Sequence, residues 1–292
     1  MIPKQVNRLI SHNVSLAAHT SLKIGGLARF YARPTSRMQL GAVIDWSRAT
    51  RTPYCILGGG TNTLFTDKGF DGLVVHMRSL RGLRTDGVTL HSAAGEMLSR
   101  VAWAACEAGL TGLEWACGIP GTIGGAVVMN AGTREGEMAN VIDSITLLDQ
   151  DHRERVSKTA LCMGYRTSAL LTGSLPGVVV DVDLVLQRND PRACIARARL
   201  IMTKRTARIP SGASAGCIFK NPSTGPTAGQ LLEQVGCKGL RIGSAVVSNL
   251  HANFIINEGT GNAEDVLALI HQMRKHVQEI TGITLDLEVL QY

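Results

Sequence analysis

Two glycine-dense turns place the strongest limit on how this chain can fold. Residues 58–62 read Gly-Gly-Gly-Thr-Asn, and residues 118–126 read Gly-Ile-Pro-Gly-Thr-Ile-Gly-Gly-Ala. The apolar run Tyr54-Cys55-Ile56-Leu57 precedes the first turn and predicts a strand that ends in a tight turn. Because glycine has no Cβ atom, each turn can offer bare N–H groups to an anion such as a pyrophosphate. Together the two turns favour one large phosphorylated ligand.

Neither turn has the spacing of a common nucleotide-binding motif. The chain contains no G-x-x-x-x-G-K-[ST] sequence, and Gly58 to Gly60 lack the spacing and the following helix of a dinucleotide-binding fingerprint. A P-loop kinase and an ordinary NAD dehydrogenase are therefore disfavoured. A single glycine cluster is more often a simple turn, but two clusters favour a binding role.

The composition predicts a mixed α/β enzyme with a substantial core. The 292 residues are 45% hydrophobic and only 4% aromatic, which argues against a base-stacking surface. The net charge of +7 leaves a nucleic acid open as a partner, and an acidic small-molecule substrate explains the charge equally well. The basic residues are scattered, with short concentrations at Arg78, Arg81, Arg84, Lys204, Arg205 and Arg208.

The cysteines predict a reducing compartment. Seven of them, at positions 55, 106, 117, 162, 194, 217 and 237, form no C-x-x-C pair, and an odd number cannot all be bridged. The amino terminus lacks an apolar signal segment, and no apolar run reaches the roughly twenty residues needed to span a bilayer. We therefore expect a soluble, cytoplasmic protein. No cluster of ligands indicates a metal site.

Hydrophobic periodicity predicts helices and strands along the whole chain. We expect helices at residues 38–48, 97–108, 190–208 and 228–235, and from a cap at Asn262 to a stop at Gly282. We expect strands at residues 54–57, 88–91, 141–148, 178–186, 217–219, 253–256 and 284–290. The predicted buried stripes are Met97, Val101, Ala104, Ala105 and Ala108 in one helix and Val266, Leu269, Ile270, Met273, Val277 and Ile280 in the last.

Six sequence blocks, in one order and spanning nearly the whole chain, carry a family resemblance. They are residues 20–26 (Thr-Ser-Leu-Lys-Ile-Gly-Gly), 56–62, 118–132 with a Met-Asn-Ala-Gly ending, 165–168 (Tyr-Arg-Thr-Ser), 214–222 (Ser-Ala-Gly-Cys-Ile-Phe-Lys-Asn-Pro) and 287–289 (Leu-Glu-Val). In these blocks the chain resembles the UDP-N-acetylenolpyruvoylglucosamine reductases of bacterial cell-wall synthesis. The short spacing between Arg166 and Cys217 resembles the family's shorter type, which lacks a tyrosine-bearing lid loop.

The resemblance implies an α+β (mixed α/β) flavoprotein. Residues 1–75 and 76–208 would be two lobes of an FAD-binding domain of the vanillyl-alcohol-oxidase/PCMH type, and residues 209–292 an α+β substrate-binding domain. It implies a monomer with noncovalent FAD and with NADPH as the reductant. The cofactor-binding residues that it implies are Lys23, Ile24, Gly25, Gly26, Ile56, Leu57, Gly58, Gly59, Gly60, Thr61, Asn62, Gly118, Ile119, Pro120, Gly121, Thr122, Gly124, Gly125 and Ala126.

The resemblance also implies the reduction of an enolpyruvyl ether on a UDP-sugar. Hydride from FAD reaches the terminal vinyl carbon, negative charge collects on the adjacent carbon and its carboxylate, and a proton completes the lactyl ether of UDP-N-acetylmuramate. Arg166 would supply a cationic fork to the carboxylate, and Glu288 a second stabiliser whose closed pocket favours a raised pKa. Taken alone, Arg166 fits a surface ion pair and Glu288 a solvated strand carboxylate.

Cys217 is where the chain departs from many family members, which carry a proton-donating serine at that position. We expect Cys217 to donate the proton as a neutral thiol, because its thiolate cannot donate. Activity should then fall as pH rises through the thiol pKa, and alkylation should inactivate the enzyme. Without the surrounding block, a small buried hydrophobic residue would be the favoured interpretation of Cys217.

The remaining implied ligands contact the UDP-sugar: Tyr165, Lys220, Asn221, Gln230 and Asn253. Lys220 and Asn221 follow Cys217 on one segment and could reach the diphosphate, although Lys-Asn-Pro alone fits an exposed turn. His251 fits a structural role better than an acid. The nearest alternative is another FAD-dependent oxidoreductase, an alcohol or sugar oxidase, which would share the glycine turns but lack the 214–222 block.

Overall fold

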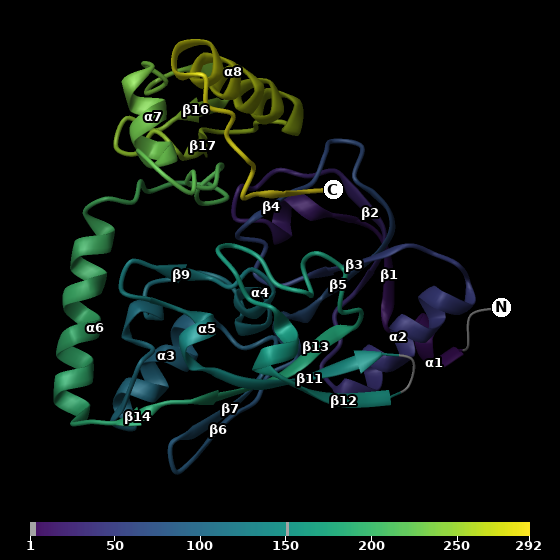
Figure 1. The fold of residues 1–292 in the computed structure, drawn as a ribbon. Coiled ribbons are helices and arrows are strands. Elements are labelled where there is room, and N and C mark those ends of the chain that lie inside the picture. Colours follow the sequence, from purple (N-terminus) through teal and green to yellow (C-terminus); the bar gives the residue numbers. More distant parts are fainter. Residues whose placement is uncertain (1–3, 150–151) are drawn as a thin grey trace. The chain divides into compact units, whose positions relative to one another are not determined.

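A computed structural model describes residues 4–149 and 152–292 of the chain (Figure 1). The described residues form two compact units. The first unit comprises Met1–Ser11, Phe30–Gly59 and Gly72–Arg205, and the second His12–Arg29, Gly60–Asp71 and Thr206–Tyr292. The predicted division at residues 75 and 208 stays a prediction.

Each predicted helix has a counterpart among the described residues. The α-helices are α1 (Lys4–Asn7), α2 (Arg37–Ala49), α3 (Leu98–Glu107), α4 (Ile123–Val128), α5 (Met138–Val141), α6 (Pro191–Thr206), α7 (Ala228–Gln234) and α8 (Ala263–Thr281). Side-chain caps set four of their starts, since Ser36, Thr122, Thr227 and Asn262 each accept a hydrogen bond from the N–H three residues later. The helix predicted to reach residue 208 ends at Thr206.

An antiparallel five-stranded sheet lies in the first unit. Its order is β12 (His152–Ser157), β11 (Ile142–Asp149), β13 (Val178–Val185), β7 (Thr89–Ala93) and β6 (Leu83–Asp86). Along β13, Val180, Val182 and Leu184 are buried, whereas Asp181 and Asp183 face the other side and are partly exposed. The predicted alternation of this strand is confirmed.

A second sheet contains the strand that leads into the first glycine turn. Its order is β1 (Ile10–Ser15), β2 (Leu27–Ala32), β5 (Phe70–His76) and β3 (Tyr54–Leu57). β3 runs parallel to β5, with Leu57 opposite His76. The strand predicted at residues 54–57 is confirmed. Two-residue strands complete the chain at β4 (Thr63–Leu64), β8 (Leu110–Thr111), β9 (Gly132–Thr133), β10 (Gly136–Glu137), β14 (Gln187–Arg188) and β18 (Leu290–Gln291).

The second unit combines α7 and α8 with a small antiparallel sheet of β15 (Arg241–Ile242), β16 (Ala245–Val247) and β17 (Ile255–Asn257). α8 packs against α7, β15 and β16 (Figure 1). Five of its six predicted stripe residues are buried: Val266, Leu269, Ile270, Met273 and Val277. Ile280 is 64% exposed, so that part of the prediction is wrong. Helical periodicity defines a face, but not where the neighbouring elements end.

The buried face of α3 also differs from the prediction. The helix buries Leu98, Val101, Ala102, Ala105 and Cys106, whereas Met97 and Ala104 are half-buried and Ala108 is exposed. The sequence in and around this helix is rich in alanine and glycine, and such small residues give only a weak periodic signal. The predicted stop is correct, because Gly109 has φ +67° and ends the helix in the left-handed region.

Two predicted strands in the second unit are not regular strands. Residues 217–219 make two single bridges, from Cys217 to Phe254 and from Phe219 to Leu287. The bridge at Leu287 is also the only described strand pairing within residues 284–289. Regular structure in that region begins only at β18. The strand predicted at 253–256 is β17, which begins two residues later.

Candidate active site

The two glycine turns touch each other within the first unit. A Cβ atom on Gly58 would lie 2.5 Å from Oγ1 of Thr122, so a side chain at Gly58 would displace this hydroxyl. The same Oγ1 accepts a hydrogen bond of 3.3 Å from the N–H of Gly125 and caps the first turn of α4. The residues predicted to share one ligand are therefore neighbours at this point.

Protein groups accept hydrogen bonds from the last four N–H groups of the second turn. Ile123 donates to the carbonyl of Glu96 at 2.9 Å and Gly124 to that of Ala94 at 3.0 Å. Ala126 donates to Thr122 within the helix. The expectation of bare N–H groups is therefore wrong for residues 123–126. The N–H groups of Ile123 and Gly124 bind the segment before α3, and those of Gly125 and Ala126 bind Thr122. A Cβ atom on Gly124 would lie 2.8 Å from that of Ala94, which explains this glycine by close packing.

Main-chain carbonyls hold the guanidinium of Arg166 in place. Its Nη2 donates to the carbonyl of Gly132 at 2.7 Å, and Nη1 to that of Asn130 at 3.4 Å. Asn130 is itself fully buried, donating from Nδ2 to Gly164 at 2.9 Å and accepting at Oδ1 from Ala139 at 2.9 Å. Both Asn130 and Arg166 adopt positive φ, at 42° and 51°. These carbonyls hold the guanidinium in a fixed direction.

A tight hairpin presents Tyr165 and Arg166 at its tip. Gly164 and Thr167 exchange two backbone hydrogen bonds of 3.1 and 3.2 Å on either side of them. The Arg166 Cζ lies 5.2 Å from the centre of the Tyr165 ring, a cation–π contact, and Tyr165 is 50% exposed. Ser168, which is buried, donates to the carbonyl of Val128 at 2.6 Å and ties the hairpin to the end of α4. The blocks at 118–132 and 165–168 thus meet.

The 20–26 and 214–222 blocks meet the first glycine turn at Ser21, in the second unit. Its Oγ donates to the carbonyl of Ser214 at 2.6 Å, and its N–H donates to the carbonyl of Gly60 at 2.9 Å. Gly60 has φ +65°, and a Cβ atom there would lie 2.1 Å from the carbonyl oxygen of His19. Ser21 was not predicted as a site residue, although its block was, because a serine hydroxyl carries no signal of a distant partner.

Cys217 lies on an extended segment between two others in the second unit. Its side chain is half-buried, and the residue bridges Phe254. The next residue, Ile218, donates its N–H to the carbonyl of Asn253 at 2.9 Å. The preceding residue, Gly216, has φ +79°, a left-handed conformation that favours glycine.

Glu288 is fixed on the other side of the same segment. Its N–H donates to the carbonyl of Ile218 at 2.8 Å, and its own carbonyl accepts from Nδ2 of Asn62 at 2.9 Å. Two of the three predicted catalytic residues, Cys217 and Glu288, therefore belong to adjoining segments of one unit. Arg166 belongs to the other unit, so the predicted three-residue arrangement stays a prediction.

Most of the predicted substrate ligands also have structural partners. Asn221 Oδ1 accepts from the N–H of Ala228 at 3.0 Å, and Gln230 Oε1 accepts from the N–H and the hydroxyl of Thr227 at 2.9 and 3.0 Å. Both side chains thus stabilise the start of α7. Lys220 is half-buried, and its main-chain N–H donates to the main-chain carbonyl of Asp286. Their contacts with substrate stay predictions.

The turn at residues 23–26 supplies one surface residue and a buried anchor. Lys23 is exposed with φ +57°, whereas Ile24 is buried in the core of the second unit. Gly26 donates to the carbonyl of Thr66 at 3.0 Å, and a Cβ atom there would lie 2.3 Å from the Asp67 carbonyl oxygen. Their roles toward FAD stay predictions.

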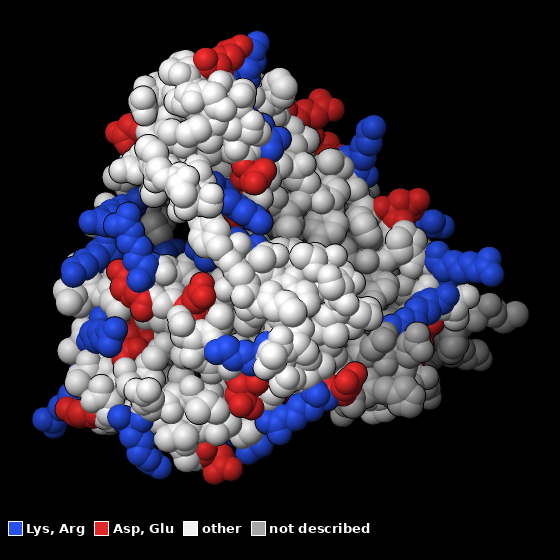
Figure 2. All heavy atoms as spheres, in the orientation of Figure 1, with Lys and Arg blue, Asp and Glu red and all other residues white. Residues whose placement is uncertain are grey.

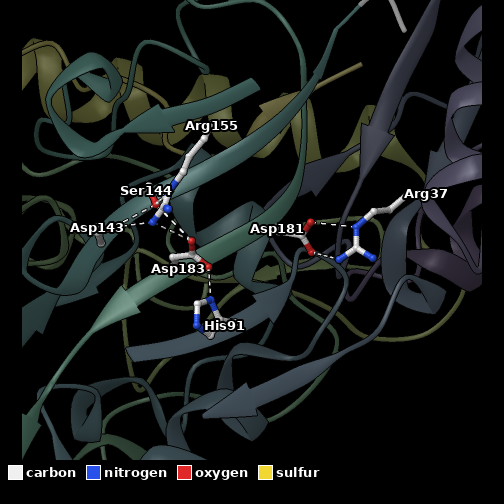
Figure 3. A network of polar contacts seen from close by, with 7 residues as sticks. All are labelled: Arg37, His91, Asp143, Ser144, Arg155, Asp181 and Asp183. Atoms are coloured by element: carbon white, nitrogen blue, oxygen red, sulfur yellow. Dashed lines mark hydrogen bonds and ion pairs between the residues drawn. The ribbon is translucent and has the colours of Figure 1, made fainter. Parts of the chain in front are cut away.

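Polar pairs on the five-stranded sheet explain several charges without a ligand. Asp181 binds Arg37, whose pKa is raised by that hydrogen bond, and Asp183 accepts from both His91 and Arg155 (Figure 3). Positive and negative side chains are interspersed over the face drawn in Figure 2.

Within residues 4–149 and 152–292, no three His, Cys, Asp or Glu side chains are grouped to hold a metal ion. No helix in these ranges is long and apolar enough to cross a membrane.

Comparison with known proteins shows the family of the chain. Residues 208–292 match the family described as UDP-N-acetylenolpyruvoylglucosamine reductase, C-terminal domain, and residues 28–155 match an FAD binding domain. A Synechococcus elongatus protein named UDP-N-acetylenolpyruvoylglucosamine reductase is 42% identical over 283 residues, covering 94% of this chain and 92% of the relative. The chain belongs to the UDP-N-acetylenolpyruvoylglucosamine reductase family.

Other members of this reductase family agree with that assignment. The relative from Chloroflexus aurantiacus is 42% identical over 281 residues, covering 94% of each chain. The crystal structure of the reductase from Thermus caldophilus matches with a TM-score of 0.81 and 36% identity, covering 96% of this chain and 97% of that one. The resemblance inferred from six blocks is confirmed, and so is the mixed α/β fold with an FAD-binding domain.

The residues of this reductase family member fit a bound FAD. The FAD-binding match at residues 28–155 includes both glycine turns. Among the described residues the N–H groups of Gly60, Thr61 and Asn62 donate to no protein acceptor, and their predicted contact with a pyrophosphate stays a prediction. Gly60 is buried and has no room for a side chain, because the His19 carbonyl oxygen lies against it, so close packing within the protein requires this glycine.

Proposed function

We propose that this reductase catalyses the NADPH-dependent reduction of UDP-N-acetylglucosamine enolpyruvate to UDP-N-acetylmuramate, a step of peptidoglycan precursor synthesis. One observation carries the assignment to particular residues. The Glu288 N–H donates to the Ile218 carbonyl, so the proposed acid and the proposed proton donor belong to adjoining segments, which supports their roles in a member of this family. Bound FAD, reduced by NADPH, supplies the hydride that adds to the terminal vinyl carbon.

Arg166 stabilises the negative charge of the reaction. The enolpyruvyl carboxylate carries the charge that builds up on the adjacent carbon, and a guanidinium can pair with it through two parallel N–H bonds. The carbonyls of Gly132 and Asn130 hold the Arg166 head, so little orientation has to be achieved when substrate binds. This anchoring supports a binding role over a mobile surface ion pair.

Cys217 and Glu288 complete the reduction. The Cys217 thiol gives its proton to the carbon that bears the ether oxygen and the carboxylate, and the resulting thiolate regains a proton from solvent. Glu288 shares a hydrogen bond with the carboxylate oxygen on which charge develops. The half-buried position of Cys217 supports this role, because the thiol is neither sealed in the core nor fully exposed.

The enzyme acts on small molecules in the cytoplasm and works as a monomer without nucleic acid or membrane. All seven cysteines lie among the described residues and none forms a disulfide, which supports a reducing compartment. The interspersed charges of Figure 2 support a small acidic substrate over a continuous nucleic-acid surface.

An anaerobic half-reaction tests the proposed function. The yellow enzyme is bleached with NADPH, the enolpyruvyl UDP-sugar is added, and the flavin absorbance is followed together with product mass. We expect the absorbance to return with one equivalent of lactyl product. Recovery of colour only on admitting oxygen, without product, would instead support the alternative of an alcohol or sugar oxidase.

A further inference from the structure

Asn253 makes an unusually complete set of contacts with the segment that carries Cys217. Its Oδ1 accepts from the N–H of Phe219 at 2.9 Å, and its Nδ2 donates to the carbonyl of Phe219 at 2.8 Å. Its own carbonyl accepts from the N–H of Ile218 at 2.9 Å. The residue is only 2% exposed. The side-chain amide is thus occupied on both of its ends by backbone, beneath the segment.

These contacts replace a strand neighbour that the segment lacks. Residues 217–219 belong to no regular strand and make only single bridges to Phe254 and Leu287. An amide side chain offers one acceptor and one donor in the spacing of a peptide group, so Asn253 satisfies Phe219 as a neighbouring strand would. Buried backbone groups left without such a partner are costly, which makes the contact a strong restraint.

We propose that Asn253 is a positioning residue for Cys217, acting through the backbone of Phe219 and Ile218, and not a ligand of the UDP-sugar. The proposal rests on the proposed function, in which Cys217 gives the proton. Ile218 lies between the two restraints, since its N–H binds Asn253 and its carbonyl binds Glu288. Asn253 therefore fixes the segment of Cys217. Through Ile218 it also fixes how the Cys217 segment is aligned with Glu288.

Asn253→Asp gives the sharpest single variant. Ionised aspartate can accept from the Phe219 N–H but cannot donate to the Phe219 carbonyl, whereas protonated aspartic acid can do both. We expect flavin reoxidation by the enolpyruvyl substrate to slow on the order of 100-fold at pH 8, with reduction by NADPH and substrate KM unchanged. Relative to wild type at each pH, the loss should shrink as pH falls and the buried carboxyl protonates. His251 also lies next to this residue, since its Nδ1 accepts from the Asn253 N–H. Because His251 is present in both proteins, the comparison with wild type at each pH removes the effect of its own titration.

Asn257→Asp is the matched control. Asn257 is also a buried amide with two backbone partners, donating to Leu22 at 3.0 Å and accepting from Gly261 at 3.1 Å. It should lose stability without slowing flavin reoxidation by the substrate. Equal slowing in both variants would mean that any buried amide matters, and would overturn the proposal. A raised KM in Asn253→Asp would overturn it too, because it would indicate a substrate contact.

A double-mutant cycle separates this proposal from the proposed function. If Asn253 acts through Cys217, Asn253→Ala should slow the wild type but have no further effect in the Cys217→Ala background. Multiplying losses would overturn the positioning role while leaving Cys217 as donor. Normal turnover of Cys217→Ala alone would instead reject Cys217 as the donor. If Asn253→Ala does not fold, Asn253→Asp in the same two backgrounds gives the same comparison.

Discussion

The side chain of Asn62 donates a hydrogen bond of 2.9 Å to the main-chain carbonyl of Glu288, 226 residues away in the sequence. The N–H of Leu290 donates in return to the carbonyl of Asn62 at 3.0 Å. The last residue of the first glycine turn is therefore tied to the segment of the candidate acid. Family resemblance implied that Asn62 contacts FAD, whereas the described partner of its side-chain amide is Glu288.

Asn62→Ala should affect the second half of the reaction more than cofactor binding. Loss of one hydrogen bond of about 1 kcal/mol should slow flavin reoxidation by the substrate roughly fivefold, while FAD affinity and reduction by NADPH stay close to wild type. Stopped-flow absorbance measures both half-reactions. The exposed Asn189 provides a control, since Asn189→Ala should change neither. Weakened FAD binding with a normal reoxidation rate would contradict this account.

Gly60→Ala should destabilise the protein and reduce its FAD content. The new Cβ atom would lie 2.1 Å from the His19 carbonyl oxygen at a residue with φ +65°, so we expect a loss of about 1–3 kcal/mol in the free energy of unfolding. Gly41→Ala is the contrast, because Gly41 lies inside α2 with nothing within 4 Å of its Cβ position. That variant should gain about 0.5–1 kcal/mol. Denaturant melts of both variants check the pair.

Alkylation should distinguish the cysteines by burial. Burial raises the pKa of Cys55 to about 12 and that of Cys237 to about 11, so neither forms an appreciable amount of thiolate at pH 8. Cys162 is exposed and Cys217 half-buried. Peptide mapping after brief iodoacetamide treatment should therefore find label at Cys162 and Cys217 first. Only the Cys217 label should abolish activity, and a Cys162→Ser enzyme should be inactivated equally fast.

Acid should destabilise the second unit through His251. Burial lowers the pKa of His251, and its Nδ1 accepts a hydrogen bond from the Asn253 N–H, so the folded protein prefers the neutral ring. The preference for a neutral His251 ring adds fully to the free energy of unfolding above the unfolded-state pKa of about 6.5. This contribution is lost as pH falls through the lower folded-state pKa. His251→Gln keeps an acceptor and should flatten the fall in unfolding free energy below pH 6.5. The same change at exposed His271 should not.

Local signals predicted most of the helices and strands. Asn262 as a cap and Gly282 as a stop delimit α8, and alternation along β13 placed Val182 inward, because such signals depend on adjacent residues. The segment 217–219 was predicted as a strand for the same reason, yet its partners are single residues far along the chain. Local alternation cannot show whether a ladder continues on either side.

The candidate site was predicted by its blocks more than by its contacts. Resemblance identified Arg166, Cys217 and Glu288, but not the carbonyls of Asn130 and Gly132 that hold Arg166. It implied a UDP-sugar contact for Asn253 and did not indicate its two hydrogen bonds to Phe219. Asparagine can cap, bind a ligand or bridge backbone, and only the position of its partners decides between these roles.

The central claim, that Cys217 protonates the substrate carbon, is tested most directly by single-turnover kinetics of NADPH-reduced enzyme mixed with the enolpyruvyl UDP-sugar without oxygen. Cys217→Ser replaces the thiol by a hydroxyl donor and should remain active, whereas Cys217→Ala should bind the substrate yet reoxidise at least about 100-fold more slowly. Reduction by NADPH should be unchanged in both variants. Wild-type rates of flavin reoxidation and lactyl product formation in Cys217→Ala would contradict the account.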